Sequence, residues 1–335
     1  MPATAIDIGT YAVKVVTGDP GKEPNIHRVV EVLNPFGVSV PSDDLQIEQL
    51  GELVNNLIFD NKLPHTDLRL SLPEALVSSK IISIPPLTDA ELASAIGWQA
   101  EQHIPIQKED LSLQYNVLFR PKKGDTQTPM RVLLIGTRKS VVDKYVNMFI
   151  SMGIEPTILE TQVLSLIRSL EITPEEPPTM ILNIGATNMD VAVVFQGEIQ
   201  FVFTHTGAGS LLTKTLQQTL GLDLQQAEQY KRSYGLDPNQ FEGKVRNSLM
   251  PTVNVLNGEI QKAQRYFTSQ FPQHTLSRIV MTGGSSQLPG LVEHLSESLG
   301  IEILFSAPFA SASGEVPAEN QQNFSVCTGL MMREL

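Results

Sequence analysis

The chain has 335 residues, of which 41% are hydrophobic and 18% charged, the composition of an ordinary globular protein. Its length favours two domains or one duplicated architecture. The formal net charge of −12 argues against a nucleic-acid partner, because phosphate binding requires a basic face.

The first half of the chain predicts alternating strands and helices. Residues 4–21 read as strand, tight turn and strand, because Ile and Val runs flank Gly9 and Thr10. Thr88 and Glu91 form a capping box at the start of the helix predicted at 89–103. Gly153 is the stop signal of the helix predicted within 131–160. The remaining predictions are a strand at 27–38, an amphipathic helix at 45–63, a short strand at 67–73, a helix at 89–103, and strand, polar turn and helix within 131–160.

The second half begins after the Pro-rich, acidic linker at 173–178, where we place the boundary between the halves. A hairpin is predicted at 181–194 and a third strand at 197–206. Helices follow at 210–220, 224–233 and 240–271, then strand, Gly-rich loop, helix and strand within 278–306, and a last helix at 323–335. The sequence therefore predicts a duplicated mixed-sheet α/β architecture.

Localisation signals are few. The single cysteine, Cys327, cannot form an intramolecular disulfide, and its apolar surroundings favour a buried structural thiol. Neither a signal peptide nor a run of about 18 apolar residues is visible, so we expect a cytoplasmic protein without direct membrane insertion. The six histidines are scattered, without metal-site spacing.

Both halves open on the same pattern, an acid or amide two residues before a turn glycine. The pairs are Asp7 with Gly9 and Asn183 with Gly185. Backbone N–H groups at such turns can hold phosphate oxygens, so two hairpins could grip a polyphosphate from opposite sides. Asp7 could hold a hydrated divalent cation, and Lys14 could neutralise a phosphate.

A third glycine loop supports a nucleotide site. Gly283 and Gly284 lie between a buried strand and a helix, where bare backbone would allow close approach of a flat ring. The hairpins and this loop resemble the actin, hexokinase and heat-shock chaperone ATPase superfamily. The segments LASAIGWQAEQHIP, LSLQYNVL, AEQYKRSYGL, EIQKAQRYFTSQ and GGSSQLPGL narrow the resemblance to the PilM family of type IV pilus assembly proteins, related to FtsA, over nearly the whole chain.

The resemblance implies a duplicated actin-like, ribonuclease H-like ATPase fold, with two domains around a nucleotide cleft and an extra subdomain of the FtsA and PilM type. The implied parts are 1–76 (first part of domain 1), 77–156 (inserted subdomain), 157–176 (domain 1 helix and linker), 177–312 (domain 2, with a helical subdomain at about 210–272) and 313–335 (a C-terminal helix returning to domain 1).

The resemblance also implies ATP and Mg²⁺ as cofactors, with Asp7 holding the metal through water. The implied nucleotide contacts are Asp7, Gly9, Thr10 and Lys14; Gly185, Ala186 and Thr187; Ala208 and Gly209; Glu228 and Lys231 beside the nucleoside; and Gly283, Gly284 and Ser285 at the adenosine.

One matched position and two departures from the family pattern bear on the chemistry of the cleft. Gln162, or the neighbouring Glu160, matches the residue that positions the attacking water in the superfamily. Asn183 stands where the family usually has Asp, and Ala208 where it usually has Gly. An amide can accept a hydrogen bond but adds no charge toward Mg²⁺, so we expect nucleotide binding with weak or no hydrolysis. We expect Asn183→Asp to retain binding and to raise hydrolysis.

The implied function is a nucleotide-binding scaffold of the pilus assembly platform, peripheral to the inner membrane through its partners. It would bind the N-terminal cytoplasmic peptide of a PilN-like membrane protein in a groove of the first domain, together with other platform proteins; homo-oligomerisation stays open. Trp98 could contact such a peptide, although core packing is the more common role of an aromatic residue.

Two alternatives belong to other classes. An FtsA-like, membrane-associated filament former would need a basic amphipathic segment, which the C-terminal residues lack. A small-molecule kinase of the same superfamily would need a carboxylate base in the cleft, and no acidic residue has an evident claim to that role.

Overall fold

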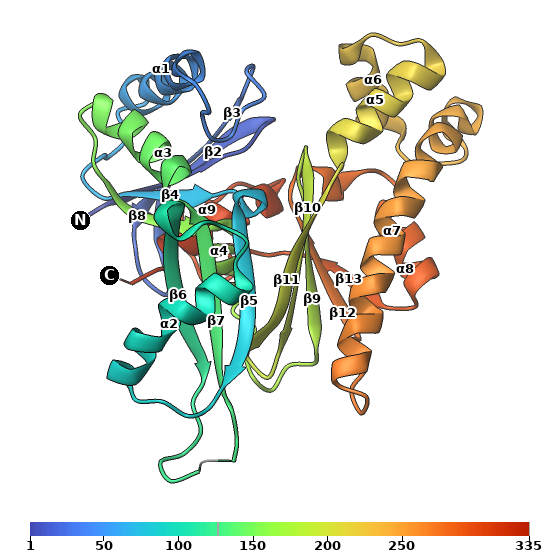
Figure 1. Ribbon diagram of the computed structural model, residues 1–335. Helices are drawn as coiled ribbons and strands as arrows, with labels where there is room; N and C mark the ends of the chain where they lie inside the picture. The colour runs from blue at the N-terminus through green and yellow to red at the C-terminus, as the bar shows by residue number, and fades with distance from the viewer. Residues whose placement is uncertain (126, 335) are drawn as a thin grey trace.

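The computed structural model describes residues 1–125 and 127–334 and contains two large mixed sheets and one small antiparallel sheet (Figure 1). The first large sheet has the order β14-β3-β2-β1-β4-β8. Its strands are β1 (Ala3–Ile8), β2 (Ala12–Asp19), β3 (Asn25–Leu33), β4 (Leu68–Leu72), β8 (Pro156–Thr161) and the short β14 (Ser313–Gly314).

The second large sheet repeats this arrangement in the order β11-β10-β9-β12-β13. Its strands are β9 (Thr179–Ile184), β10 (Asn188–Phe195), β11 (Glu198–Thr206), β12 (Arg278–Thr282) and β13 (Glu302–Phe305). In both sheets an antiparallel three-strand meander precedes two parallel strands. The predicted duplicated α/β architecture is therefore confirmed.

Helices on each sheet bury the apolar strand residues. The first half has α1 (Asp44–Asp60), α3 (Lys139–Ser151) and α4 (Gln162–Ser169). The second half has α5 (Gly209–Leu220), α6 (Leu224–Tyr234), α7 (Lys244–Gln270) and α8 (Leu291–Leu299). The helix predicted at 240–271 is interrupted, because Phe241 and Glu242 have positive φ; a 3₁₀ turn η3 (Gln240–Gly243) precedes α7. The other 3₁₀ turns are η1 (Glu74–Leu76), η2 (Lys108–Asp110), η4 (Gly284–Gln287) and η5 (Gln321–Phe324).

The small sheet, of order β5-β7-β6, lies beside the first large sheet (Figure 1). It consists of β5 (Val77–Ile84), β6 (Leu111–Phe119) and β7 (Met130–Arg138), covered by α2 (Asp89–His103). The predicted capping box of Thr88 and Glu91 is confirmed at the start of α2. The helix α3 leaves this sheet, because its Tyr145 and Phe149 are buried in the core of the first large sheet. We propose that the inserted subdomain ends near Arg138.

Trp98 does not pack in a core, so that expectation was wrong. The residues that α2 buries, Leu92, Ile96 and Ala100, follow one another at intervals of four. Trp98 lies halfway between the last two and so faces the opposite side of the helix. Its side chain is 59% exposed.

The C-terminal helix α9 (Ser325–Met331) returns to the first large sheet and packs against β1 and α4. Arg69, only 2% exposed, donates to the backbone carbonyls of Leu330 and Arg333 and pairs with Asp67. Cys327 is fully buried, which confirms the structural thiol, and burial raises its pKa well above the usual range. Among the described residues, none of the helices is both long and apolar enough to cross a membrane.

Candidate functional site

A cleft of about 510 Å³ lies between the two large sheets, where both hairpins meet the Gly283 loop. Such a volume lies within the range of small-molecule sites. Most of the predicted site residues line it, namely Asp7, Gly9, Thr10, Lys14, Gln162, Asn183, Gly185, Ala186, Thr187, Glu228, Lys231, Gly283, Gly284 and Ser285. Ala208 and Gly209 lie just behind this lining, at the start of α5. The structure thus brings together segments that are far apart in the sequence.

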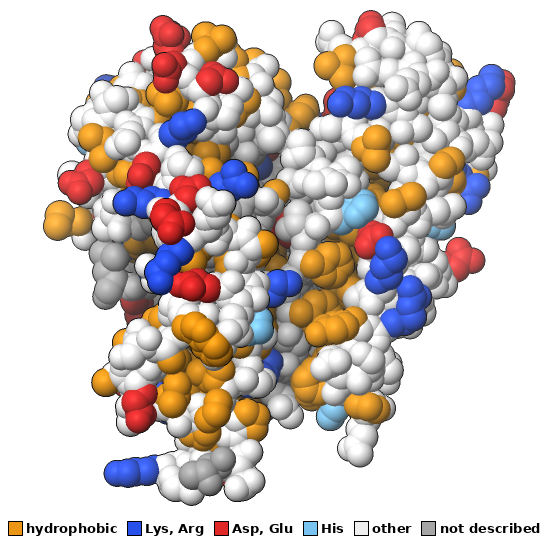
Figure 2. Space-filling view, viewed as in Figure 1, with side chains coloured by type: hydrophobic (Ala, Val, Ile, Leu, Met, Phe, Trp, Pro, Cys, Tyr) orange, Lys and Arg blue, Asp and Glu red, His pale blue; other side chains and the backbone are white. Residues whose placement is uncertain are grey.

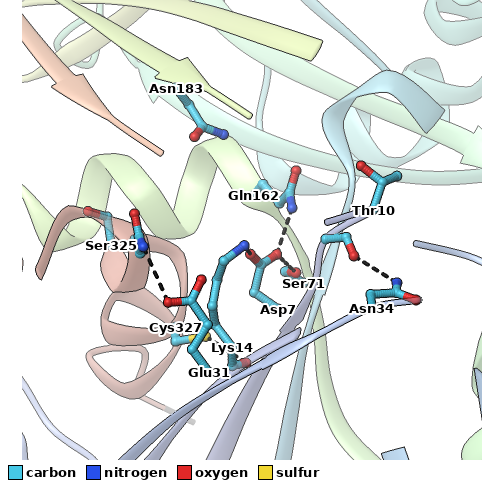
Figure 3. A network of polar contacts seen from close by, with 12 residues as sticks. Asp7, Thr10, Lys14, Glu31, Asn34, Ser71, Gln162, Asn183, Ser325 and Cys327 are labelled. Carbon is cyan, nitrogen blue, oxygen red and sulfur yellow. Dashed lines mark hydrogen bonds and ion pairs between the residues drawn. The ribbon is translucent and has the colours of Figure 1, made fainter. Parts of the chain in front are cut away.

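Asp7, at the end of β1, is held by three neighbours (Figure 3). Ser71 Oγ and Gln162 Nε2 each donate to Asp7 Oδ1 over 2.6 Å. Lys14 Nζ lies 3.5 Å from Asp7 Oδ2, because the register of β1 and β2 pairs the two residues directly. Asp7 is only 4% exposed, and these three contacts hold its carboxylate in place.

The second hairpin repeats this geometry with different chemistry. Asn183 of β9 pairs with Asp190 of β10, as Asp7 pairs with Lys14. Asn183 Nδ2 donates to Asp190 Oδ2 over 3.0 Å, and Thr204 Oγ1 donates to Asp190 Oδ1 over 2.8 Å. The second hairpin therefore does carry a carboxylate, seven residues after the amide. Asp190 was missed in the sequence, although the same spacing separates Asp7 from Lys14.

Two buried carboxyl groups in this region titrate unusually. Burial raises the pKa of Asp190 to about 6, and the hydrogen bonds from Thr204 and Asn183 offset only part of that effect. Glu74, on η1 between the sheets, is 3% exposed. Burial and then the charge of Asp190 raise the pKa of Glu74 to about 7. Ser79 Oγ donates to Glu74 Oε1, whereas Glu74 Oε2 has no partner among the described residues.

The structure separates the two candidates for positioning water. Gln162, the first residue of α4, reaches Asp7 in the cleft. Glu160 instead forms salt bridges with Arg168 and Arg333, and Ser165 Oγ donates to it. Its carboxylate therefore ties α4 to the C-terminal residues, and the geometry favours Gln162 as the cleft residue.

A polar network joins α6 to the start of α5. Lys231 Nζ donates to Gly209 O, Thr213 Oγ1 and Glu228 Oε2, and burial lowers the pKa of Lys231. Burial raises the pKa of Glu228, but the hydrogen bonds from Arg232, Lys231 and Thr213 outweigh it and leave that pKa below the usual range. The network fixes the wall of the cleft against the second hairpin.

Two glycines allow the loops of the second half to approach one another. A Cβ at Gly209 would clash with Ser285 Oγ, which donates to Gly185 O over 2.8 Å. Gly283 has φ +83°, and a Cβ there would lie 2.6 Å from Asn183 Oδ1. Gly283 is therefore required by its positive φ and by the nearby backbone carbonyl of Ile184, whereas Gly209 makes room for the Ser285 side chain.

The cleft also has contacts between its two sides. Thr10 Oγ1 and Thr187 Oγ1, from the two hairpin turns, lie 3.5 Å apart. At the opening, the Arg232 guanidinium lies 4.8 Å from the centroid of the Tyr11 ring. The two hairpin turns therefore meet at one end of the cleft.

The charged side chains of the cleft fit a nucleotide bound together with a hydrated divalent cation. They fit less well a metal ion whose ligands all come from the protein. Lys14 and Lys231 offer positive charge, and Asp7 and Asp190 offer carboxylate oxygens beside it. Within the described part of the chain, no group of three or more His, Cys, Asp and Glu could hold a metal ion. Mg²⁺ typically takes one or two carboxylates and completes its shell with phosphates and water.

The chain is similar to proteins of type IV pilus assembly and of cell division. The family model described as type IV pilus assembly protein PilM matches residues 5–335. The cell division protein FtsA of Neisseria meningitidis serogroup B is 23% identical over 98% of this chain and 89% of its own length.

Solved structures support the same fold. The chain superimposes on a PilM–PilN type IV pilus biogenesis complex with a TM-score of 0.85 and 21% identity, covering 98% of this chain and 97% of that one. MreB5 of Spiroplasma citri, bound to ADP, gives a TM-score of 0.56 at 12% identity, over 98% and 94% of the two chains. The predicted actin-like fold is confirmed.

Proposed function

Because the chain belongs to the PilM family of type IV pilus assembly proteins, we propose that it is a nucleotide-binding scaffold of the inner-membrane assembly platform. The observation that carries this proposal is the cleft between the two hairpins, with Asp7 held by Ser71, Gln162 and Lys14. The protein would be cytoplasmic and would reach the membrane through its partners.

ATP would occupy the cleft with its phosphates between the hairpin turns at Gly9 and Gly185. Lys14 would face the phosphates, and Asp7 and Asp190 would orient water on Mg²⁺, which neutralises phosphate charge when bound. Glu228 and Lys231 would flank the nucleoside, beside the Gly283 loop. Hydrolysis would be weak, because Asn183 brings no charge of its own and the Asp190 carboxylate beside it already accepts hydrogen bonds from Asn183 and Thr204.

Lys14→Met is expected to weaken Mg²⁺-ATP binding about tenfold, because it removes one charge-assisted contact while keeping the aliphatic length. Isothermal titration calorimetry measures the affinity. Lys22→Met, at an exposed position outside the cleft, is the matched control and should bind like the wild type. Equal affinity of Lys14→Met and wild type would contradict the placement of the phosphates, and absence of binding by the wild type would contradict the nucleotide proposal.

A PilN-like membrane protein is the proposed partner, through its N-terminal cytoplasmic peptide; other platform proteins and a second copy of the chain are further proposed partners. The support is the likeness to a solved PilM–PilN complex. Trp98 is a candidate contact, because a large exposed aromatic side chain is typical of residues that dominate binding energy.

Trp98→Ala is expected to weaken binding of that peptide about tenfold, since truncating a central aromatic contact costs more than 1 kcal/mol. Fluorescence anisotropy with the labelled peptide measures the affinity. Phe119→Ala on β6 removes another exposed aromatic from the same subdomain and is the control. If both variants bind like the wild type, Trp98 lies outside the contact; if the wild type does not bind, the partner proposal fails.

A further inference from the structure

The opening of the cleft is spanned by a contact between its two walls. Figure 2 shows the surface hollowed between the first half and the helices α5 and α6, whose residues line one wall of the cleft. Tyr11, in the turn between β1 and β2, and Arg232 of α6 both belong to the lining. The Arg232 guanidinium lies over the Tyr11 ring, 4.8 Å from its centroid, which makes a cation–π contact.

Tyr11 is presented to the opening by a turn whose backbone is fixed. The backbone N–H of Asn34, the residue after β3, donates to Tyr11 O over 2.8 Å. The side-chain amide Nδ2 of Asn34 donates to Gly9 O over 2.9 Å, and Asn34 is only 6% exposed. The turn is thus tied to the end of β3, while Tyr11 itself remains 39% exposed. Its ring is therefore free to rotate although its backbone is held.

Arg232 is held on the opposite wall by Glu228, one turn earlier on α6. Arg232 Nε donates to Glu228 Oε1 over 2.8 Å. The other oxygen of this carboxylate, Oε2, accepts hydrogen bonds from Lys231 Nζ and Thr213 Oγ1 over 2.6 Å each. Glu228 is therefore fixed against the start of α5. This ion pair directs the Arg232 guanidinium across the opening towards Tyr11.

The contact across the opening is weak enough to break and re-form. The side chain of Arg232 is 59% exposed, and an exposed cation–π contact shifts an equilibrium by roughly two- to fivefold. Tyr11 directly follows Gly9 and Thr10, the turn at which the phosphates of a nucleotide are proposed to lie. A ligand held by this turn would lie beside the contact, and its passage through the opening would require the two side chains to separate.

We propose that Tyr11 and Arg232 form a gate that slows both the entry of Mg²⁺-ATP into the cleft and its release. This inference rests on the proposed function, because it requires a nucleotide in the cleft. The two side chains separate when the ligand passes and make the same contact again afterwards. The gate therefore sets the lifetime of the complex, whereas the affinity is set by the residues inside the cleft.

Stopped-flow fluorescence with N-methylanthraniloyl-ATP and Mg²⁺ measures the association and dissociation rate constants. Tyr11→Leu should raise both rate constants about threefold and leave the dissociation constant within about 1.5-fold of the wild type, because it removes the ring but keeps the charge of Arg232. Tyr11→Phe should behave like the wild type, since the contact needs the ring and not the hydroxyl. Tyr266→Leu, on α7 and 51% exposed, is the matched control outside the cleft and should change neither rate constant.

A second variant tests the other partner of the gate. Arg232→Gln should also raise the dissociation rate constant about threefold, and its combination with Tyr11→Leu should raise it no further, because both changes remove one contact. Circular dichroism checks that each variant is folded. Unchanged rate constants in Tyr11→Leu, or slower association with weaker affinity, would overturn the gate and leave the nucleotide site standing. Absence of nucleotide binding by the wild type would overturn both.

Discussion

Asn183→Asp is expected to destabilise the ligand-free protein by roughly 3 kcal/mol at pH 8, because it places a second carboxylate against buried Asp190. Asn183 Nδ2 now donates to Asp190 Oδ2 over 3.0 Å, and that hydrogen bond lowers the pKa of Asp190. The exchange replaces a stabilising donor by a like charge. Two adjacent carboxyl groups in one buried site cannot both ionise at low cost.

The sign of the pH dependence follows from this repulsion. A carboxyl pair whose pKa is raised in the folded state loses stability as pH rises above the unfolded value of about 4. The variant should therefore approach wild-type stability at pH 5 and fall furthest below it at pH 8. Mg²⁺-ATP should restore part of the loss, because the cation compensates the added charge, and hydrolysis should rise in its presence.

The measurement is the midpoint of urea unfolding at pH 5 and pH 8, with and without Mg²⁺-ATP, together with ADP release. Asn183→Asp combined with Asp190→Asn is the matched control: it keeps one amide and one carboxylate and should recover stability at pH 8. Asn247→Asp, exposed on α7, adds the same charge outside the cleft and should change little. Equal loss at both pH values would show that charge repulsion is not the cause.

The duplicated fold was accessible from the sequence because its signals are local. Ile and Val runs around Gly9 and Gly185 predict hairpins, and Thr88 with Glu91 predicts a helix start; each depends on residues close in the chain. The repeated hairpin pattern also contained Asp190, since its distance from Asn183 equals that of Lys14 from Asp7. The equivalence of Asp190 and Lys14 is hard to see in the sequence, because one pair combines an acid with a base and the other an amide with an acid.

The features of the fold and the site that could not be predicted depend on contacts between segments that lie far apart in the chain. Periodicity in α2 was sufficient to place Trp98 on the outer face, but the expectation rested on residue type alone. Glu74 follows Pro73 in a short turn, and no local pattern shows that α4 and the second hairpin bury it. Likewise, Glu160 and Gln162 differ by two positions in the sequence, and only the fold directs one to Arg168 and the other to Asp7.

Glu74→Gln is expected to stabilise the protein by up to about 3 kcal/mol at pH 8, since one pKa unit corresponds to about 1.4 kcal/mol. The pKa of Glu74 is raised from 4.5 to about 7, first by burial and then by the charge of Asp190. The wild type therefore loses stability as pH rises from 4.5 through 7, whereas glutamine does not titrate. At pH 4.5 the two proteins should be equally stable.

Urea unfolding followed by far-UV circular dichroism at pH 4.5 and pH 8 tests this expectation. The fluorescence of the exposed Trp98 would report poorly on burial of the core. Glu52→Gln, exposed on α1, is the matched control and should leave the pH dependence unchanged. If the free energy of unfolding of Glu74→Gln and of the wild type changed with pH in the same way, ionisation of Glu74 would not destabilise the folded protein. If Glu74→Gln is more stable than the wild type, the protein retains at Glu74 a carboxylate that lowers its stability. Such a residue beside the cleft is expected where selection acts on function rather than on stability.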